Sequence, residues 1–170
     1  MGILSLLTFF PLVGVILLLA MRKASDNTLK GVAIGTSVVT FVLSIVVLGQ
    51  FDSGVAGLQL VDRFSWIEAW GIEYHMGIDG ISVLMVLLTT FIMMLAIPSS
   101  WNAISTQIRQ YYIFMLLLEA GFLGVFLAQD LFLFFIFWEF TLVPMYFLIG
   151  IWGGKNRVYA DANRWRITGV

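Results

Sequence analysis

Residues 131–152 read LFLFFIFWEFTLVPMYFLIGIW and contain one charged side chain, that of Glu139. A run of about 20 apolar residues is long enough to cross a bilayer as a helix. A carboxyl group in the middle of such a helix costs about 2.5 to 3.5 kcal/mol on insertion scales, so an intramembrane acidic residue marks a candidate functional site. The stretch therefore predicts a transmembrane helix with a candidate site at Glu139.

The composition of the whole chain indicates an integral membrane protein. Of its 170 residues, 61% are hydrophobic and 11% are charged, whereas ordinary soluble domains have about 25% charged residues. Four further apolar stretches have spanning length, namely residues 3–21, 31–49, 78–97 and 111–128. We predict an all-α membrane protein with five transmembrane helices in residues 1–152. Residues 153–170 are predicted to form a polar tail on the cytoplasmic or matrix side.

A polar and mixed segment, residues 50–77, separates the second and third spans. Four of its apolar residues roughly follow helical spacing, namely Leu60, Phe64, Ile67 and Trp70. This spacing favours a short amphipathic segment at the membrane interface. An extended hairpin would suit the segment almost as well. Just beyond it, Asp79 is placed to cap the third helix, because a carboxylate is favoured at a helix N-terminus.

The basic residues predict how the chain is oriented. If the first connector is cytoplasmic, eight of the nine basic residues lie on that side: Arg22, Lys23, Lys30, Arg109, Lys155, Arg157, Arg164 and Arg166. Only Arg63 lies opposite, together with Asp52, Asp62, Glu68, Glu73, Asp79 and Asp130. Because cytoplasmic loops are enriched in Lys and Arg, we predict an N-terminus on the outside.

A second carboxyl, that of Glu119, lies within the fourth span. It precedes the turn at residues 129–130 by ten or eleven positions, and Glu139 follows that turn by nine or ten. At 1.5 Å per residue, both carboxyls are predicted about 15 Å below the outer surface, in the centre of a core about 30 Å thick. The small residues Gly121 and Gly124 would let another helix approach closely.

Pro144 supports the site as a helix-breaking residue. It cannot donate to the carbonyl of Phe140, and a carbonyl freed at membrane depth needs water, a side chain or local unwinding. Such an opening beside Glu139 would suit a hydrated proton path, although Pro144 can instead merely bend a packed helix. For both glutamates, the alternative to a titrating proton path is a neutral carboxyl hydrogen-bonded inside the bundle. The predicted spans contain no Lys or Arg to pair with either one.

The residue inventory excludes several kinds of cofactor site. The chain has no cysteine and one histidine, His75, which excludes disulfides, thiolate metal sites and iron–sulfur clusters held by its own thiols. We expect this chain to bind no cofactor, so any redox chemistry takes place elsewhere. The expected surroundings are the lipid bilayer and other membrane proteins, with no nucleic acid.

Several runs resemble one family. They are GIDGIS at 77–82, Glu119 followed by GVF at 124–126, DL at 130–131, FWE at 137–139 and LVPMYFLIGIWGG at 142–154. Over about residues 1–160, they resemble the antiporter-like M-type membrane subunits of respiratory complex I, called chain 4 of NADH–ubiquinone oxidoreductase in mitochondria. Multisubunit sodium/proton antiporters share the GIDGIS region, but the run from Pro144 to Gly154 is more similar to the complex I family.

The resemblance implies a function and a site. It implies a subunit that translocates protons across a bacterial cytoplasmic or mitochondrial inner membrane, driven by quinone reduction in a distant part of the complex. Glu139 matches the central glutamate of the family's fifth helix, and Glu119 matches that of its fourth. The basic partners would lie in later helices. NADH, flavin, iron–sulfur clusters and quinone are expected in other subunits.

The last residues depart from the family pattern. The family continues into an apolar sixth helix after position 160, whereas residues 161–170 read DANRWRITGV. We expect a frameshift, a truncation or a split gene product, and expect the chain to be inactive alone. Two other classes stay open: a sodium/proton antiporter subunit, and a structural membrane-arm protein whose glutamates only bridge helices.

Overall fold

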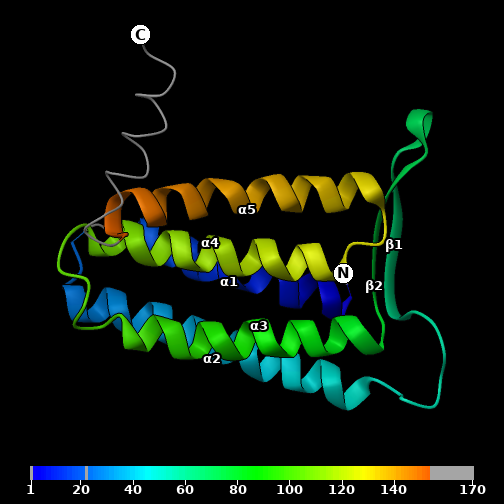
Figure 1. Cartoon of the computed structure of the whole chain (residues 1–170), viewed down its shortest axis with the longest axis horizontal. Coiled ribbons are helices and arrows are strands. Elements are labelled where there is room, and N and C mark those ends of the chain that lie inside the picture. Colours follow the sequence, from blue (N-terminus) through cyan, green and yellow to red (C-terminus); the bar gives the residue numbers. More distant parts are fainter. Residues whose placement is uncertain (1, 22, 154–170) are drawn as a thin grey trace, which may run out of the picture.

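The computed structural model describes residues 2–21 and 23–153 (Figure 1). Its helices are α1 (Ile3–Ala20), α2 (Asp26–Gln50), α3 (Gly80–Ser99), α4 (Ile108–Leu127) and α5 (Leu131–Trp152). Between α2 and α3 lie β1 (Gln59–Ile67), a 3-10 turn at Glu68–Trp70 and β2 (Ile72–Ile78). Within the described residues, all five helices are long and apolar enough to cross a membrane. The predicted membrane fold is therefore confirmed.

Two helices begin earlier in the chain than the apolar stretches suggest. α2 begins at Asp26 instead of residue 31, because the Ser25 hydroxyl accepts a hydrogen bond from the Thr28 backbone N–H at 3.3 Å and caps the helix. α4 begins at Ile108 instead of residue 111. Polar residues in the first turns of both helices thus extend them beyond the apolar spans.

The segment between α2 and α3 is an antiparallel hairpin, so its interpretation as a helical interfacial segment is wrong and the extended alternative is confirmed. Phe64 pairs with Tyr74 across the strands, and their rings stack with centroids 4.6 Å apart. Gly71, in the left-handed conformation at φ 65°, helps the chain to reverse. Cross-strand aromatic packing of this kind stabilises a sheet and outweighs a loosely helical spacing.

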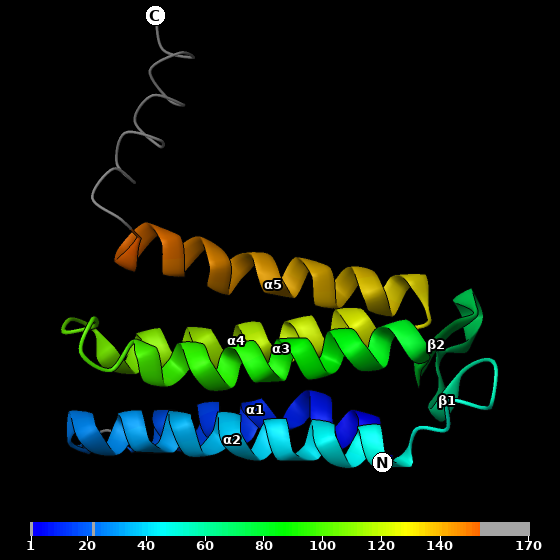
Figure 2. The same cartoon turned by 60° about the horizontal axis from the view of Figure 1, so that its bottom comes forward.

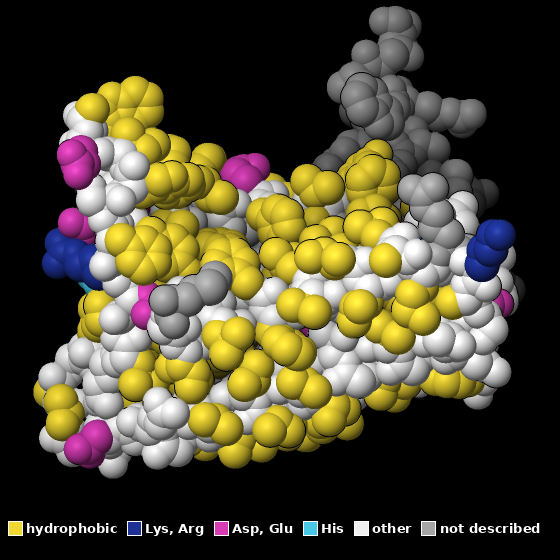
Figure 3. Space-filling model, turned by 180° about the vertical axis from the view of Figure 1, so that it is seen from behind, with side chains coloured by type: hydrophobic (Ala, Val, Ile, Leu, Met, Phe, Trp, Pro, Cys, Tyr) yellow, Lys and Arg dark blue, Asp and Glu magenta, His cyan; other side chains and the backbone are white. Residues whose placement is uncertain are grey.

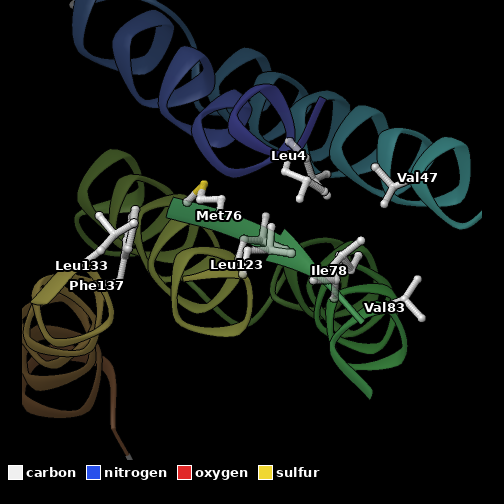
Figure 4. Packing of buried hydrophobic residues seen from close by; sticks show 11 residues of the cluster. Leu4, Val47, Met76, Ile78, Val83, Leu123, Leu133 and Phe137 are labelled. Carbon is white, nitrogen blue, oxygen red and sulfur yellow. The ribbon is translucent and has the colours of Figure 1, made fainter. Parts of the chain in front are cut away.

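Strand β2 closes one end of the bundle, which we call the hairpin end. Its Met76 and Ile78 are fully buried and pack with Leu4, Leu123 and Val47 from three helices (Figure 4). The strand is also tied to the turn between α4 and α5. The Gln129 backbone N–H donates to the His75 carbonyl at 2.8 Å, and its side-chain amide donates to the Gly77 carbonyl at 3.3 Å.

Helix α5 lies at the edge of the bundle and packs chiefly on α4, whereas α1 to α4 pack on one another (Figures 1 and 2). α2 and α3 are joined by a 2.8 Å hydrogen bond between Ser44 and Thr90. At the end opposite the hairpin, the Lys30 ammonium donates to the Trp101 carbonyl at 2.7 Å. A one-sided position leaves one face of α5 uncovered.

Charged side chains gather mostly at the two ends of the molecule, and hydrophobic ones cover the middle (Figure 3). Lys23, Lys30 and Arg109 belong to the end opposite the hairpin, and Arg63 to the hairpin end. The basic residues that the sequence places on opposite sides of the membrane thus lie at opposite ends of the structure. The outside position of the N-terminus stays a prediction, and residues 154–170 of the predicted tail lie outside the described residues.

Candidate functional site

Glu119 lies in the interior of the bundle. Its side chain is 0% exposed, on the same face of α4 as the buried residues Leu116 and Leu123. Neither carboxyl oxygen has a hydrogen-bond partner among the described residues. Most buried polar atoms in proteins have a partner, so a fully enclosed carboxyl without one is a functional-site candidate.

Contacts between α1 and α4 bring a proline to the level of this carboxyl. A Cβ added to Gly14 would lie 2.8 Å from Cδ1 of Leu116, so α1 and α4 approach closely at that point. The two helices run in opposite directions (Figure 1). Pro11, three residues before Gly14 and buried, is therefore level with Glu119, three residues after Leu116. Proline has no N–H, so the carbonyl one turn earlier in α1 loses its helical partner.

Contacts between α4 and α5 confirm the expected role of the small residues on α4. A Cβ added to Gly121 would lie 2.6 Å from Cγ2 of Thr141, and one added to Gly124 would overlap the Phe137 ring. Glycines of this kind let membrane helices pack closely. Gly121 and Gly124 also set the register of the two helices, which fixes where the candidate site residues of α5 lie.

Pro144 lies at about the same height along the bundle as Glu119. It is buried on the face of α5 that packs on α4, three residues beyond Thr141. Because Thr141 contacts Gly121 and the helices are antiparallel, Pro144 comes to the level of residue 118. α5 continues through it to Trp152. The prolines of two different helices thus flank the layer that contains Glu119.

Glu139 faces the other way. It is exposed, two positions after the buried Phe137 and two before the buried Thr141, on the face of α5 that points away from α4. The register also separates the two carboxyls in depth, with Glu139 about one helical turn, or roughly 5 Å, nearer the hairpin end. The structure therefore does not bring Glu119 and Glu139 together in one interior site.

A polar network at the hairpin end was not recognised in the sequence. The Ser5 hydroxyl and backbone N–H donate to the Asp62 carboxylate at 2.6 and 3.1 Å, and the Tyr74 hydroxyl lies 2.8 Å from the Ser5 hydroxyl. Burial raises the pKa of Tyr74 above its ordinary value. The three residues lie up to 69 positions apart, so no local pattern could reveal the contact.

The arrangement around Glu119 is suited to holding a proton. An ionised carboxylate buried without a partner is unfavourable by several kcal/mol. A protonated one carries its own donor and needs only an acceptor, such as a carbonyl left free by a proline. In residues 2–21 and 23–153, no group of three or more His, Cys, Asp or Glu side chains is placed to hold a metal ion.

Comparison with known protein families identifies the chain. Residues 5–128 match the family described as NADH-ubiquinone oxidoreductase chain 4, amino terminus. Residues 128–168 match a second one, described as NADH:quinone oxidoreductase/Mrp antiporter. The chain belongs to the NADH-ubiquinone oxidoreductase chain 4 family. The resemblance found in the sequence motifs is thus confirmed. Glu119 lies within the first matched region and Glu139 within the second.

Two relatives from different organisms are named as parts of such an oxidoreductase. NADH-quinone oxidoreductase subunit M of Rhodobacter capsulatus is 45% identical over 163 residues, which are 94% of this chain and 31% of the relative. NADH-ubiquinone oxidoreductase chain 4 of Mycosarcoma maydis is 40% identical over 155 residues, 89% of this chain and 32% of the relative. The chain thus spans about a third of the length of these relatives.

A solved structure supports the fold. A chain in respiratory complex I from Thermus thermophilus with bound NADH superposes with a TM-score of 0.73 at 22% identity, over 92% of this chain and 31% of that chain. At this identity the likeness concerns the arrangement of helices alone. Together with the five candidate spans, it establishes a multi-pass membrane protein with this family's fold.

Proposed function

We propose that this chain is part of an antiporter-like, proton-translocating membrane subunit of an NADH:quinone oxidoreductase. The observation that carries the proposal is the family match over residues 5–128, supported by relatives named as subunits of that enzyme. The site adds a fully buried carboxyl, that of Glu119, without a partner among the described residues. The host membrane is a bacterial cytoplasmic or mitochondrial inner membrane.

In the proposed mechanism, both glutamates carry protons. Glu139 exchanges its proton as its pairing with a basic residue changes, and Glu119 holds a second proton within the bundle. The central turns of the described helices contain no Lys or Arg, so the basic residue must come from another segment or subunit. The exposed face of α5 is where such a segment would pack. Pro144 supports the site by leaving the carbonyl of Phe140, the residue after Glu139, without its helical partner.

Electron transfer belongs to other subunits in this proposal. The sequence has no cysteine to hold an iron–sulfur cluster. In line with the family resemblance, NADH, flavin and quinone would also be bound by other subunits, and the other membrane-arm subunits are the partners. The chain alone should not pump protons, because Glu139 then lacks its basic partner. This expectation can be checked by reconstituting the chain in vesicles and measuring proton uptake.

The decisive experiment is Glu139→Gln in the full-length subunit of an assembled complex. Glutamine has nearly the same shape but does not titrate, so proton pumping should be lost while assembly is retained. Tyr146→Phe is a matched control, because Tyr146 is also exposed on α5 and the change removes only a hydroxyl. Normal pumping by the assembled Glu139→Gln complex would refute the proposed role.

A sodium/proton antiporter subunit is the second candidate, because the description of the family matched by residues 128–168 includes Mrp antiporters. Sodium-dependent proton flux in vesicles without any redox partner would favour it. A purely structural role is the third candidate, and it predicts a different result for the same variant. In that case Glu139→Gln would reduce assembly, and the complexes that still assemble would transport normally.

A further inference from the structure

The buried face of α2 carries a stripe of polar side chains. It contains one ammonium and four hydroxyl groups, those of Lys30, Thr36, Ser37, Thr40 and Ser44. Thr40 is 0% exposed, and its hydroxyl donates to the Thr36 carbonyl of the same helix at 2.9 Å. A hydroxyl that donates one hydrogen bond still has lone pairs that can accept another. Thr40 therefore offers an acceptor in the interior of the bundle.

The Thr40 side chain points toward the axis of the bundle formed by α1 to α4. Thr36 contacts α1, because a Cβ added to Gly14 would lie 2.5 Å from the Thr36 hydroxyl oxygen. Ser44 contacts α3 through its 2.8 Å hydrogen bond with Thr90. Each step of four residues turns a side chain by about 40° around the helix, so Thr40 projects between these two contacts. The helix on that side is α4, on which α2 also packs.

The Glu119 side chain points toward the same axis. It lies two residues before Gly121, which contacts α5 at Thr141, and two residues turn a side chain by about 200°. Glu119 therefore faces away from α5 and into the space that α1 to α4 enclose, in agreement with its full burial. The carbonyl that Pro144 frees belongs to α5 and is thus out of its reach.

Thr40 and Glu119 lie in one layer of the bundle. Thr36 and Leu116 contact α1 at the same residue, Gly14, and α2 and α4 run in the same direction (Figure 1). Thr40 is four residues beyond Thr36, and Glu119 is three beyond Leu116. At 1.5 Å per residue, the two positions differ in height by about 1.5 Å.

Among the described residues, no other helix offers a comparable acceptor in this layer. α1 contributes Pro11, and the carbonyl that Pro11 leaves free, that of Leu7, lies about one turn nearer the hairpin end. The Glu119 side chain leans the other way, toward the N-terminus of α4. α3 contributes the buried Met93, three residues beyond Thr90, and a thioether accepts only weakly.

We propose that Thr40 is a positioning residue for Glu119, whose protonated carboxyl donates a hydrogen bond to the Thr40 hydroxyl oxygen after a change of side-chain rotamer. The change is needed because neither Glu119 oxygen has a partner in the described conformation. Thr40 donates onward to the Thr36 carbonyl, so each proton in the chain has an acceptor. The contact holds the Glu119 proton at the bundle axis. Its role in transport rests on the proposed function, whereas the contact itself does not.

Infrared spectroscopy of the 170-residue chain in lipid bilayers tests the contact. The C=O stretch of protonated Glu119 is identified by its disappearance in Glu119→Gln, and loss of a hydrogen bond raises the frequency of such a band. Thr40→Val replaces the hydroxyl by a methyl group of similar size and should shift the band to higher frequency. Thr40→Ser keeps the hydroxyl and should leave the band in place. An unshifted band in Thr40→Val, or no band of protonated Glu119 in the parent chain, overturns the proposal.

Ser37 provides a matched control within the stripe. It is also buried, but it lies one residue after Thr36, which turns its side chain by about 100°, past Ser44 and to the α3 side. Ser37→Ala should therefore leave the Glu119 band in place. A shift in Ser37→Ala that Thr40→Val does not produce would show that Ser37 is the partner, and would overturn the assignment to Thr40.

The role in transport is measured as proton pumping by the full-length subunit in an assembled complex. Thr40→Val should lower the pumping rate about fivefold, the effect of one hydrogen bond of ordinary net strength, and Thr40→Ser should restore it. A role in packing alone predicts the reverse order, because valine keeps the shape of threonine and serine leaves a gap. Thr89→Val is the control, because Thr89 lies on α3 outside the stripe and its hydroxyl donates to the Met85 carbonyl.

The two proposals can fail separately. Normal pumping in the assembled Thr40→Val complex, together with lost pumping in Glu139→Gln, would overturn the positioning role and leave the proposed function intact. Normal pumping in Glu139→Gln would refute the proposed role of Glu139, while a shifted infrared band in Thr40→Val would still establish the contact between Thr40 and Glu119.

Discussion

The inner face of α4 and the outer face of α5 each carry one glutamate, but the protein surrounds them differently. Glu119 is enclosed by its own bundle and has no partner among the described residues. Glu139 is exposed on a helix that packs on one side only. The difference shows that a carboxyl in a membrane-spanning helix can lie either in the packed interior of the bundle or on an outer face that no described residue covers.

The contrast concerns folding as much as transport. A buried carboxyl without a partner opposes folding, so its presence in the interior of α4 calls for a functional reason. An exposed carboxyl on α5 has the same surroundings before and after the bundle folds, so its free energy changes little on folding. The same chemical substitution should therefore affect the two helices differently.

The largest effect is expected from a substitution between the two helices. Gly124→Leu would drive a side chain into the Phe137 ring and should destabilise the bundle by about 3 kcal/mol, the upper part of the usual overpacking range. Gly150→Leu on α5 is the control, because nothing lies within 4 Å of its added Cβ. Thermal unfolding in detergent measures both. Equal destabilisation would show that the packed face of α5 is wrongly assigned.

The comparison of the carboxyls themselves is tested by Glu119→Leu and Glu139→Leu. Removing the enclosed, partnerless carboxyl should stabilise the chain by about 2 kcal/mol, because the desolvation penalty disappears. The same change at the exposed Glu139 should alter the free energy of unfolding by less than about 0.5 kcal/mol. Denaturant unfolding in micelles gives both values. A stabilisation of similar size at both positions would show that the two carboxyls do not differ in burial as described.

A third carboxyl, that of Asp79 at the N-terminus of α3, shows the effect of hydrogen bonds that Glu119 and Glu139 lack within the described residues. The backbone N–H and hydroxyl of Ser82, with the Ile81 N–H, bond to Asp79 and hold its pKa below the ordinary value. Asp79→Ala should destabilise the protein by about 1 kcal/mol. Since the folded pKa lies below the unfolded one, this stabilisation is present above the unfolded pKa and is lost as pH falls through the folded pKa. The variant should therefore lose less stability on acidification than the parent chain.

The smallest effect is expected at the exposed ion pair of the hairpin. The Arg63 guanidinium donates to both Glu73 oxygens, at 2.6 and 3.0 Å, and holds the pKa of that carboxyl below its ordinary value. Arg63→Gln should raise the pKa of Glu73, measured by NMR titration of carboxyl-labelled protein. The helices should be unaffected, because exposed pairs contribute little to stability. A large loss of helicity would mean that the hairpin supports the bundle through this pair.

Part of the candidate site could be predicted and part could not. Glu119 and Glu139 stand out because charges are rare in apolar spans, and Gly121 and Gly124 because small residues mark helix contacts. The direction of each side chain is not visible, since α5 is apolar on all sides and no hydrophobic stripe identifies its buried face. For the same reason, the alignment of Pro11 and Pro144 with Glu119 could not be foreseen. It depends on contacts between helices far apart in the chain.

The sequence by itself determined the membrane environment, the five spans, the separation of charges to two ends and the family, because these follow from length, polarity and motif. Only the tertiary structure decided that Glu119 is enclosed, that Glu139 faces outward and that residues 59–78 form a hairpin instead of a helix. These features depend on how each helix is rotated about its axis and on aromatic contacts across strands. Such contacts arise only when the whole chain packs.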